Sequence, residues 1–332
     1  MIRIEENEYF KINKLINKNN ELSVYSLLDL MVRGEIYVDN EETPQSALIK
    51  TPECNYLIGE ADNVVFNKEV KEKLDFWDTI TFDSDDYEKN ILYVHPNKKI
   101  RKYTRLRFCI NPSKVENGQD SVLSGYKLEI ITKELLEKSY DNKELITDWI
   151  NNYKNEDMFF KYGFGVAIIY DNAIVAASLT DCFYRNKISI GMKVEEKHRK
   201  KGLGKLCVRK MIEIAKERQI DLIDWLCVSQ NKGSIALATS CGFYFSNFYY
   251  SFASYAPIEN LSDLTNLEWN EWGNYFYDAS KEEPKLFDEA VYAYCKAHNY
   301  SRVSELLAVK NNSSFTEYIK KFMNYLDGLN KD

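Results

Sequence analysis

Residues 188–215, ISIGMKVEEKHRKKGLGKLCVRKMIEIA, contain the pattern that decides the fold of the middle of the chain. Over 188–194, apolar residues alternate with small or polar ones, which predicts a strand with one buried face. From Leu203 onward, apolar residues recur every three or four positions, which predicts an amphipathic helix. A strand therefore leads through a turn with two glycines into the start of a helix.

The turn has the composition of an anion-binding site. Gly202 and Gly204 allow unusual backbone angles and close approach of a ligand. The first turn of a helix offers backbone N–H groups and the positive end of its dipole to an anion. The basic residues around the turn are Lys197, Arg199, Lys200, Lys201 and Lys205. We expect a phosphate-rich ligand here, although the turn taken alone also fits an ordinary solvated helix start.

Two motifs in order give this turn a closer match. Arg199-Lys-Lys-Gly202-Leu-Gly204 resembles motif A of the GNAT superfamily, Gln/Arg-x-x-Gly-x-Gly/Ala. Downstream, a predicted strand at 222–228 leads to Asn231-Lys-Gly-Ser234 and then to Gly242-Phe243, which resembles motif B of that superfamily. The resemblance implies an α/β (α+β) GNAT fold, a mixed, twisted sheet flanked by helices. Its fourth and fifth strands would splay apart around the pantetheine arm of coenzyme A.

The resemblance also implies which residues hold acetyl-coenzyme A, the acyl donor. Backbone groups at Met192, Lys193 and Val194 would bond the pantetheine amides and polarise the thioester carbonyl. Asn231 would reach the arm from the facing strand, with Ser234 beside it. The diphosphate would lie against Arg199, Lys200, Lys201, Gly202, Leu203, Gly204 and Lys205. No metal is implied.

The beginning of the chain resembles a particular bacterial subfamily. The stretch GEIYVDNEETPQSALIK at 34–50 is similar to the amino-terminal half of the GNAT subfamily that includes the zwittermicin-resistance acetyltransferases. In that subfamily this half is a degenerate GNAT-like domain without a diphosphate loop. Here no Gly-x-Gly follows NYLIGEA at 55–61. The resemblance, which extends over most of 20–255, implies that only the middle domain binds coenzyme A.

Three domains are predicted along the chain. The polar stretch NPSKVENGQDS at 111–121 has the composition of a linker, and an aromatic strand pattern ends near Pro257. We place a degenerate GNAT-like domain at 1–118, a GNAT acetyltransferase domain at 119–257 and an all-helical tail at 258–332. Four short helices are expected in the tail, with Trp269, Trp272 and Phe276 at helical spacing, Pro284 at a helix start and a capping box at 314–317. They loosely resemble a tetratricopeptide array, which either packs on its neighbour or binds a protein partner.

Composition narrows the functional classes. The 332 residues are 45% hydrophobic and carry a formal net charge of -7, which argues against a nucleic-acid surface. No apolar run reaches the roughly 18 residues of a membrane span, and the start is acidic, so we expect a cytoplasmic bacterial protein. The seven scattered cysteines support neither a disulfide framework nor a zinc site. Cys207 and Cys241 are expected to be buried in helices, and the basic residues Arg101, Lys102, Arg105 and Arg107 to form a solvated strand face.

The resemblance implies an N-acetyltransferase in which a primary amine of a small molecule attacks the thioester directly. The usual general acid, a tyrosine seven residues after the motif B asparagine, is Ala238 here, and the positions of the usual bases hold Ile188 and Leu226. The remaining candidates for proton transfer are Asp224, Tyr244 and Tyr249, each of which a structural role would also explain. The alternative function is a non-catalytic acyl-coenzyme A binding or regulatory module.

Overall fold

A computed structural model of the chain describes residues 1–16, 21–75, 78–97, 100–116, 123–253, 266–282, 284 and 286–309. The chain divides into two compact units, Met1–Ile258 and Glu259–Asp332. Both predicted domain boundaries, 118/119 and 257/258, lie outside the described residues. Among the described residues, no helix has the length and apolar character needed to cross a membrane.

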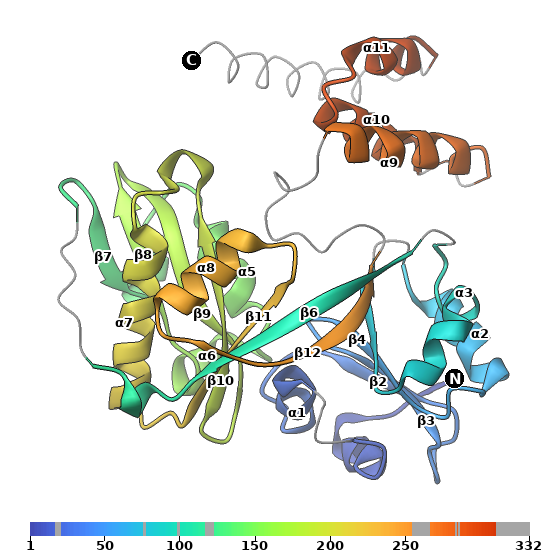
Figure 1. The fold of residues 1–332 in the computed structure, drawn as a ribbon. Coiled ribbons are helices and arrows are strands. Elements are labelled where there is room, and N and C mark those ends of the chain that lie inside the picture. The colour runs from blue at the N-terminus through green and yellow to red at the C-terminus, as the bar shows by residue number, and fades with distance from the viewer. Residues whose placement is uncertain are drawn as a thin grey trace. The chain divides into compact units, whose positions relative to one another are not determined.

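The first half of the larger unit combines short helices with short strands (Figure 1). Helix α1 (Leu22–Leu28) precedes three antiparallel strands, and α2 follows them. The strands of this half are β1 (Ile2–Arg3), β2 (Glu35–Val38), β3 (Ser46–Lys50), β4 (Asn55–Gly59) and β5 (Ile80–Phe82). Its other helices are α2 (Val64–Lys73), α3 (Ile91–Val94) and the 3-10 helices η1 (Glu6–Ile12) and η2 (Asp85–Asn90).

The second half contains the elements predicted from the two motifs. Its strands are β7 (Lys127–Ile130), β8 (Gly165–Tyr170), β9 (Ala173–Tyr184), β10 (Lys187–Val194), β11 (Leu222–Val228) and β12 (Tyr244–Ala253). Its helices are α4 (Lys133–Glu137), α5 (Glu144–Ile150), α6 (Glu156–Tyr162), α7 (Leu203–Glu217) and α8 (Lys232–Ser240), with η3 (Pro112–Lys114) and η4 (Glu196–His198) as 3-10 turns. Asp171 and Asn172 join β8 to β9 with φ of 47° and 63°, as a type I′ hairpin requires.

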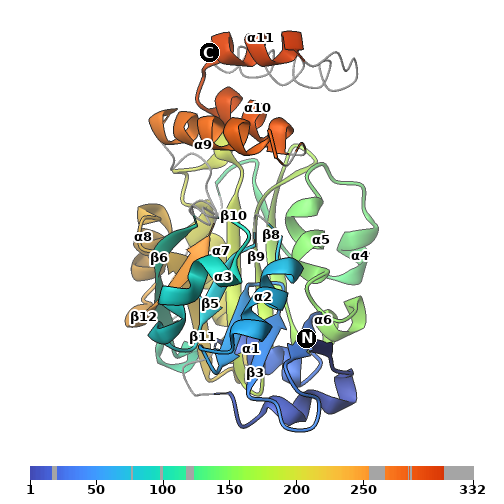
Figure 2. The ribbon, with the colours of Figure 1, turned by 90° about the vertical axis from the view of Figure 1, so that its right-hand side faces the viewer.

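Two helical layers enclose the second half of the sheet. Apolar side chains of α7, such as Cys207 and Met211, pack with Ile188 of β10 and Ile223 of β11 on one face. Helices α4, α5 and α6 cover the other face of β8 and β9, and in Figure 2 they lie on the opposite side from α8 and β12. Cys207 is fully buried within α7, as predicted. Cys241 is also buried, but it follows the last residue of α8 and does not lie in the helix.

The two halves are joined by an exchange of strands. A single sheet has the order β1-β2-β3-β4-β5-β12-β6-β11-β10-β9-β8-β7, where β6 is Arg101–Ile110. Strand β6 comes from the first half of the sequence but pairs with β11 of the second half. Strand β12 ends the second half but pairs with β5 of the first. Figure 1 shows both strands running between the halves, so neither half completes its sheet alone.

The position of β6 corrects one prediction. Leu106, Phe108 and Ile110 on this strand face the α7 core. Arg105 lies on the opposite face, is buried, and its guanidinium is 2.5 Å from Glu53. The side chain of Arg107, also predicted to be solvated, is only 13% exposed. The expectation of a solvated face was wrong for these two arginines because the first half of the chain covers that face of β6.

The smaller unit is helical, as expected. Helices α9 (Asn266–Ala279), α10 (Leu286–Lys296) and α11 (Tyr300–Val309) are described, and Trp269, Trp272 and Phe276 of α9 are buried. Pro284 lies two residues before α10. A methyl group on Gly273 would lie 2.6 Å from the ring of Tyr294, so this glycine lets α9 and α10 pack closely. The predicted fourth helix and its capping box lie outside the described residues.

Candidate functional site

A gap opens between β10 and β11 in the second half of the sheet. The two strands pair in parallel only from Lys187 with Leu222 to Ser189 with Asp224. Beyond these pairs, β10 continues along β9 to Val194, while β11 continues along β6 to Val228. The predicted separation of the fourth and fifth strands is therefore confirmed. The gap exposes one edge of each strand to an extended ligand.

Backbone donors of β10 point into this gap. The N–H of Glu195 donates to the carbonyl of Val175 on the β9 side, at 2.8 Å. Because hydrogen-bonding directions alternate along an antiparallel pair, the N–H groups of Val194 and Met192 point to the other side. Lys193 is exposed and its own backbone faces β9. The N–H groups of Met192 and Val194 can thus bond an amide or polarise a carbonyl oxygen placed in the gap.

The loop before α7 has the backbone of an anion-binding turn. Lys200 and Gly202 both have positive φ, 60° and 79°. Gly202 is the N-cap residue and provides no side-chain cap, while the first backbone bond of the helix runs from the Leu206 N–H to the Gly202 carbonyl (3.1 Å). The N–H groups of the first turn therefore have no partner within the helix. A methyl group on Gly202 would meet no protein atom within 4 Å, so the space beside the turn is open.

The corresponding helix start in the first half differs. Helix α2 is capped by Asn63, whose side-chain oxygen accepts the Phe66 N–H at 3.1 Å. The amide of Asn63 also donates to Asp39 (2.9 Å), which brings a carboxylate to the helix start. A side-chain cap and a carboxylate take the positions that an anion would need. This helix start is therefore unsuited to a diphosphate, in accord with the missing Gly-x-Gly.

The predicted diphosphate residues other than Gly202 divide into four groups. Lys200 and Lys205 make no ion pair within the described part of the chain and remain available to a ligand. Arg199 donates from Nε to the Val194 carbonyl at 3.2 Å, and Lys201 donates to the Tyr126 hydroxyl at 3.0 Å, so both brace the loop. The side chain of Leu203 is buried in the core, which leaves only its backbone for a ligand. Gly204 sits against α8, because a methyl group there would lie 3.1 Å from Leu237.

The motif B residues have local partners. The side-chain oxygen of Asn231 accepts the Ser234 N–H at 2.9 Å and caps α8. The Ser234 hydroxyl accepts from the indole nitrogen of Trp225 on β11 at 2.8 Å. The amide nitrogen of Asn231 has no hydrogen-bond partner among the described residues, so it can still donate to a ligand. Ser234 fixes α8 on the strand.

The three candidates for proton transfer lie in different surroundings. Asp224 is buried, accepts from the Cys109 thiol (3.2 Å) and is 3.9 Å from Arg107; burial raises the pKa of its carboxyl. The Tyr249 hydroxyl accepts from Arg105 at 3.3 Å, and burial raises its pKa well above the ordinary value. Tyr244 is 57% exposed at the start of β12. Arg107 contacts two of these side chains, because its guanidinium lies 3.9 Å from the Asp224 carboxylate and 6.0 Å from the centre of the Tyr249 ring.

Acidic residues near the gap were missed from the sequence. A small cavity is lined by Ser189 and Leu226, which stand on the two separating strands, and by Glu21, Glu53 and Asp181. The Asp181 carboxylate would lie 2.8 Å from a methyl group placed on Gly191 of β10. These acids come from the residue before α1, a loop and β9, and no local pattern connects them. Only the folded chain shows that they face one position.

Comparison with known proteins settles the family. A sequence profile of GNAT acetyltransferases matches residues 13–252, which include both halves of the large unit. The chain belongs to the GNAT acetyltransferase family. It is therefore an acetyltransferase, and the fold class predicted from the motifs is correct.

Individual relatives of this GNAT protein agree with that assignment. The chain is 25% identical over 230 residues to the uncharacterized N-acetyltransferase YdfB of Bacillus subtilis. The aligned region covers 66% of this chain and 85% of that protein. A GCN5-related N-acetyltransferase-like protein from Streptococcus suis has a TM-score of 0.60, 19% identity and coverage of 74% and 98% of the two chains. A tandem GNAT protein from the clavulanic acid biosynthesis pathway has a TM-score of 0.51, 12% identity and coverage of 77% and 99%. These two structures share the fold; the zwittermicin-resistance subfamily stays a prediction.

Proposed function

We propose that this protein transfers an acetyl group from acetyl-coenzyme A to a primary amine of a small molecule by direct attack of the amine on the thioester. The observation that carries the proposal is the β10–β11 gap, which opens beside a helix start that has a glycine as its N-cap. The gap has the inward N–H groups that an extended pantetheine arm needs. The helix start has the open space and positive charge that a diphosphate needs.

The chemistry follows from the direction of the backbone donors. Acetyl-coenzyme A supplies a thioester whose carbonyl carbon is open to nucleophilic attack. When an amine nitrogen attacks that carbon, negative charge develops on the carbonyl oxygen. The Val194 N–H, which points into the gap, is placed to donate to this oxygen and to lower the barrier. The thiolate that leaves is a moderate base, with an ordinary thiol pKa near 8.5, so its protonation needs no strong acid.

The helix start is tested by Gly202→Ala. A methyl group here meets no protein atom within 4 Å, and the left-handed backbone costs a non-glycine residue about 1–2 kcal/mol. The methyl group instead projects into the space assigned to the diphosphate. We expect the dissociation constant for coenzyme A to rise about tenfold, which equals about 1.4 kcal/mol, or one lost charge-assisted hydrogen bond. Isothermal titration calorimetry measures this change.

Gly242→Ala is the matched control. Gly242 also has a positive φ, 93°, but follows α8, away from the α7 start. Gly242→Ala should lower the free energy of unfolding by about as much as Gly202→Ala does, and it should leave the affinity for coenzyme A unchanged. Equal affinity in wild type and Gly202→Ala would contradict the diphosphate site. Thiol release from acetyl-coenzyme A across a panel of primary amines tests the reaction itself, and binding without any thiol release would contradict the proposed function.

A further inference from the structure

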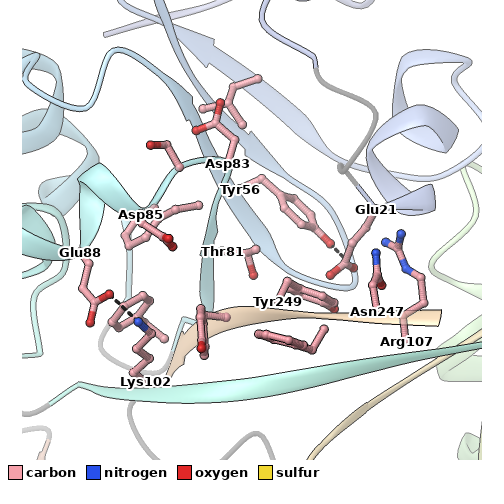
Figure 3. Close-up of a pocket in the computed structure, with 16 residues that line it drawn as sticks. Glu21, Tyr56, Thr81, Asp83, Asp85, Glu88, Lys102, Arg107, Asn247 and Tyr249 are labelled. Atoms are coloured by element: carbon pink, nitrogen blue, oxygen red, sulfur yellow. Dashed lines mark hydrogen bonds and ion pairs between the residues drawn. The ribbon is translucent and has the colours of Figure 1, made fainter. Parts of the chain in front are cut away.

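A cavity of about 390 Å³ lies where the first half meets the exchanged strands. Its walls come from β4 and β5, from η2, and from β6 and β12. Figure 3 shows Asp85 and Glu88 at one end of this acceptor cavity and Glu21 and Arg107 at the other, with the Tyr56 ring between them. The two ends therefore carry charged groups, and the middle is aromatic.

The charge balance of the acceptor cavity is negative. Four carboxyl groups and two cations line it. Of the two cations, Lys102 pairs with Glu88. Arg107 lies 3.9 Å from Asp224, outside the cavity, and its Nε makes no hydrogen bond among the described residues. Glu21, Asp83 and Asp85 make no ion pair within the described ranges of the chain.

Asp83, which lines the acceptor cavity, has a carboxylate oxygen that accepts no hydrogen bond among the described residues. One carboxylate oxygen, Oδ2, accepts the Gly59 N–H at 3.2 Å. The other, Oδ1, is buried and has no hydrogen-bond partner among the described residues. Buried polar atoms are almost always bonded, so this oxygen calls for a donor from a ligand or water. Burial also raises the pKa of the Asp83 carboxyl, and a cation beside it would oppose that rise.

Aromatic rings fill the space between the charged ends. Tyr56, Phe82, Tyr249 and Tyr250 all line the cavity. The faces of such rings attract cations, and Lys102 already lies 3.9 Å from the centre of the Tyr250 ring. Carboxylates with aromatic faces suit an aliphatic chain that bears ammonium groups. They disfavour a phosphate-rich ligand, which distinguishes this cavity from the α7 start.

Glu21 connects the acceptor cavity to the gap. Its side chain lines both this cavity and the small cavity that includes Ser189 of β10 and Leu226 of β11. Glu21 is nearly fully buried and accepts from the Tyr56 hydroxyl at 2.6 Å. Burial, reinforced by Glu53, raises the pKa of its carboxyl, which makes the carboxylate a better proton acceptor.

We propose that the acceptor cavity binds the amine substrate, and that this substrate is an aliphatic diamine or polyamine whose reacting nitrogen lies at Glu21 and whose second ammonium group lies at Asp83 and Asp85. The inference rests on the proposed acetyl transfer. The reacting ammonium gives a proton to the Glu21 carboxylate, and its freed electron pair forms the C–N bond. The C–S bond then breaks, and the thiolate takes the second proton from the nitrogen of the adduct. Glu21 returns its proton to water.

The experiment is steady-state kinetics of the full chain with 1,4-diaminobutane, spermidine and, as a monoamine of matched length, butylamine. Loss of one charge-assisted contact lowers the affinity for the amine about tenfold. We expect kcat/KM for each polyamine to exceed that for butylamine by about tenfold or more. Asp83→Asn and Asp85→Asn should each raise KM for 1,4-diaminobutane about tenfold, far more than they raise KM for butylamine, and leave KM for acetyl-coenzyme A unchanged.

Two further variants sharpen the test. Asp86→Asn removes the neighbouring carboxylate, which does not line the cavity, so it controls for net charge alone. Glu21→Gln should lower kcat for every amine while KM for acetyl-coenzyme A stays constant. Asp85 is exposed on η2, so its substitution leaves the core intact even where Asp83→Asn proves unstable.

The outcomes separate the two proposals. If amines are acetylated but Asp83→Asn and Asp85→Asn behave like Asp86→Asn, the acceptor cavity is wrong and the acetyl transfer stands. Equal kcat/KM for 1,4-diaminobutane and butylamine would likewise overturn the diamine assignment. If 1,4-diaminobutane binds by calorimetry yet no amine releases thiol, both the acceptor role and the proposed function fall.

Discussion

Substitution of Asn231 separates two roles that the structure gives to one side chain. Its oxygen caps α8 through the Ser234 N–H at 2.9 Å, and its nitrogen faces no partner among the described residues. Asn231→Ala removes both groups. Asn231→Asp keeps the capping oxygen, adds a negative charge that the helix start favours, and loses only the N–H donor.

The expected magnitudes follow from these contacts. Loss of an N-cap costs about 1 kcal/mol, so Asn231→Ala should lower the melting temperature of this unit by about 2–4 °C. The free energy of unfolding of Asn231→Asp should lie within about 0.5 kcal/mol of the wild-type value, because the helix cap is retained. Both variants should bind coenzyme A about three- to tenfold more weakly, the value of one neutral hydrogen bond. Thermal unfolding and calorimetry give the two readouts.

Two results would refute this reasoning. Equal stability of Asn231→Ala and Asn231→Asp would show that the oxygen does not cap α8 in solution. Unchanged coenzyme A affinity in both variants would show that the nitrogen does not reach the pantetheine arm. Ser234→Ala is a useful comparison, since it removes the acceptor of the Trp225 indole but keeps the backbone N–H that Asn231 caps.

One buried imidazole and two buried thiols give further predictions. Burial lowers the pKa of His95 from 6.5 to about 4, and its ring bonds the Asp78 carbonyl (2.8 Å) and the Asn97 N–H (3.0 Å). The free energy of unfolding should therefore be unaffected by His95 above pH 6.5 and fall by about 3 kcal/mol as the pH drops to about 4. Urea unfolding of wild type and His95→Gln at several pH values checks this. The same pH dependence of the unfolding free energy in both proteins would contradict it. Burial raises the pKa of the Cys207 and Cys109 thiols to about 12, so a thiol reagent at pH 8 should label them only after unfolding. Mass spectrometry measures the labelling, and rapid labelling of either cysteine in the native protein would contradict this prediction.

Local signals in the sequence were sufficient to predict the strand and the helix starts that form the proposed coenzyme A site. The strand predicted at 222–228 has the bounds of β11, and the helix predicted from Leu203 onward begins at that residue. Gly202 and Asn231 mark helix starts through contacts within four residues. Such features depend on neighbours along the chain, which a pattern of spacing records directly.

The exchange of β6 and β12 could not be predicted in the same way. Arg105 pairs with Val228 on one side and with Tyr249 on the other, more than one hundred residues away. The alternation in β6 shows that it has two different faces but not what covers each face. Because the first half covers the face of Arg105 and Arg107, a pattern typical of a solvated strand became a buried, charged wall. The acceptor cavity was missed for the same reason, since its acids come from separate elements.

The difference between α2 and α7 explains why we propose an anion site at only one of the two helix starts. A helix start binds an anion only when its first N–H groups are free and its surroundings are not acidic. Gly202 meets the first condition at α7, whereas Asn63 and Asp39 remove both conditions at α2. Once α2 cannot hold a phosphate, carboxylates such as Asp83 can accumulate beside β4 and β5 without repelling a cofactor. In the sheet, β12 and β6 lie between β5 and β11, so the acidic surface and the β10–β11 gap belong to one sheet, and the cationic acceptor is proposed for the half whose helix start does not suit an anion.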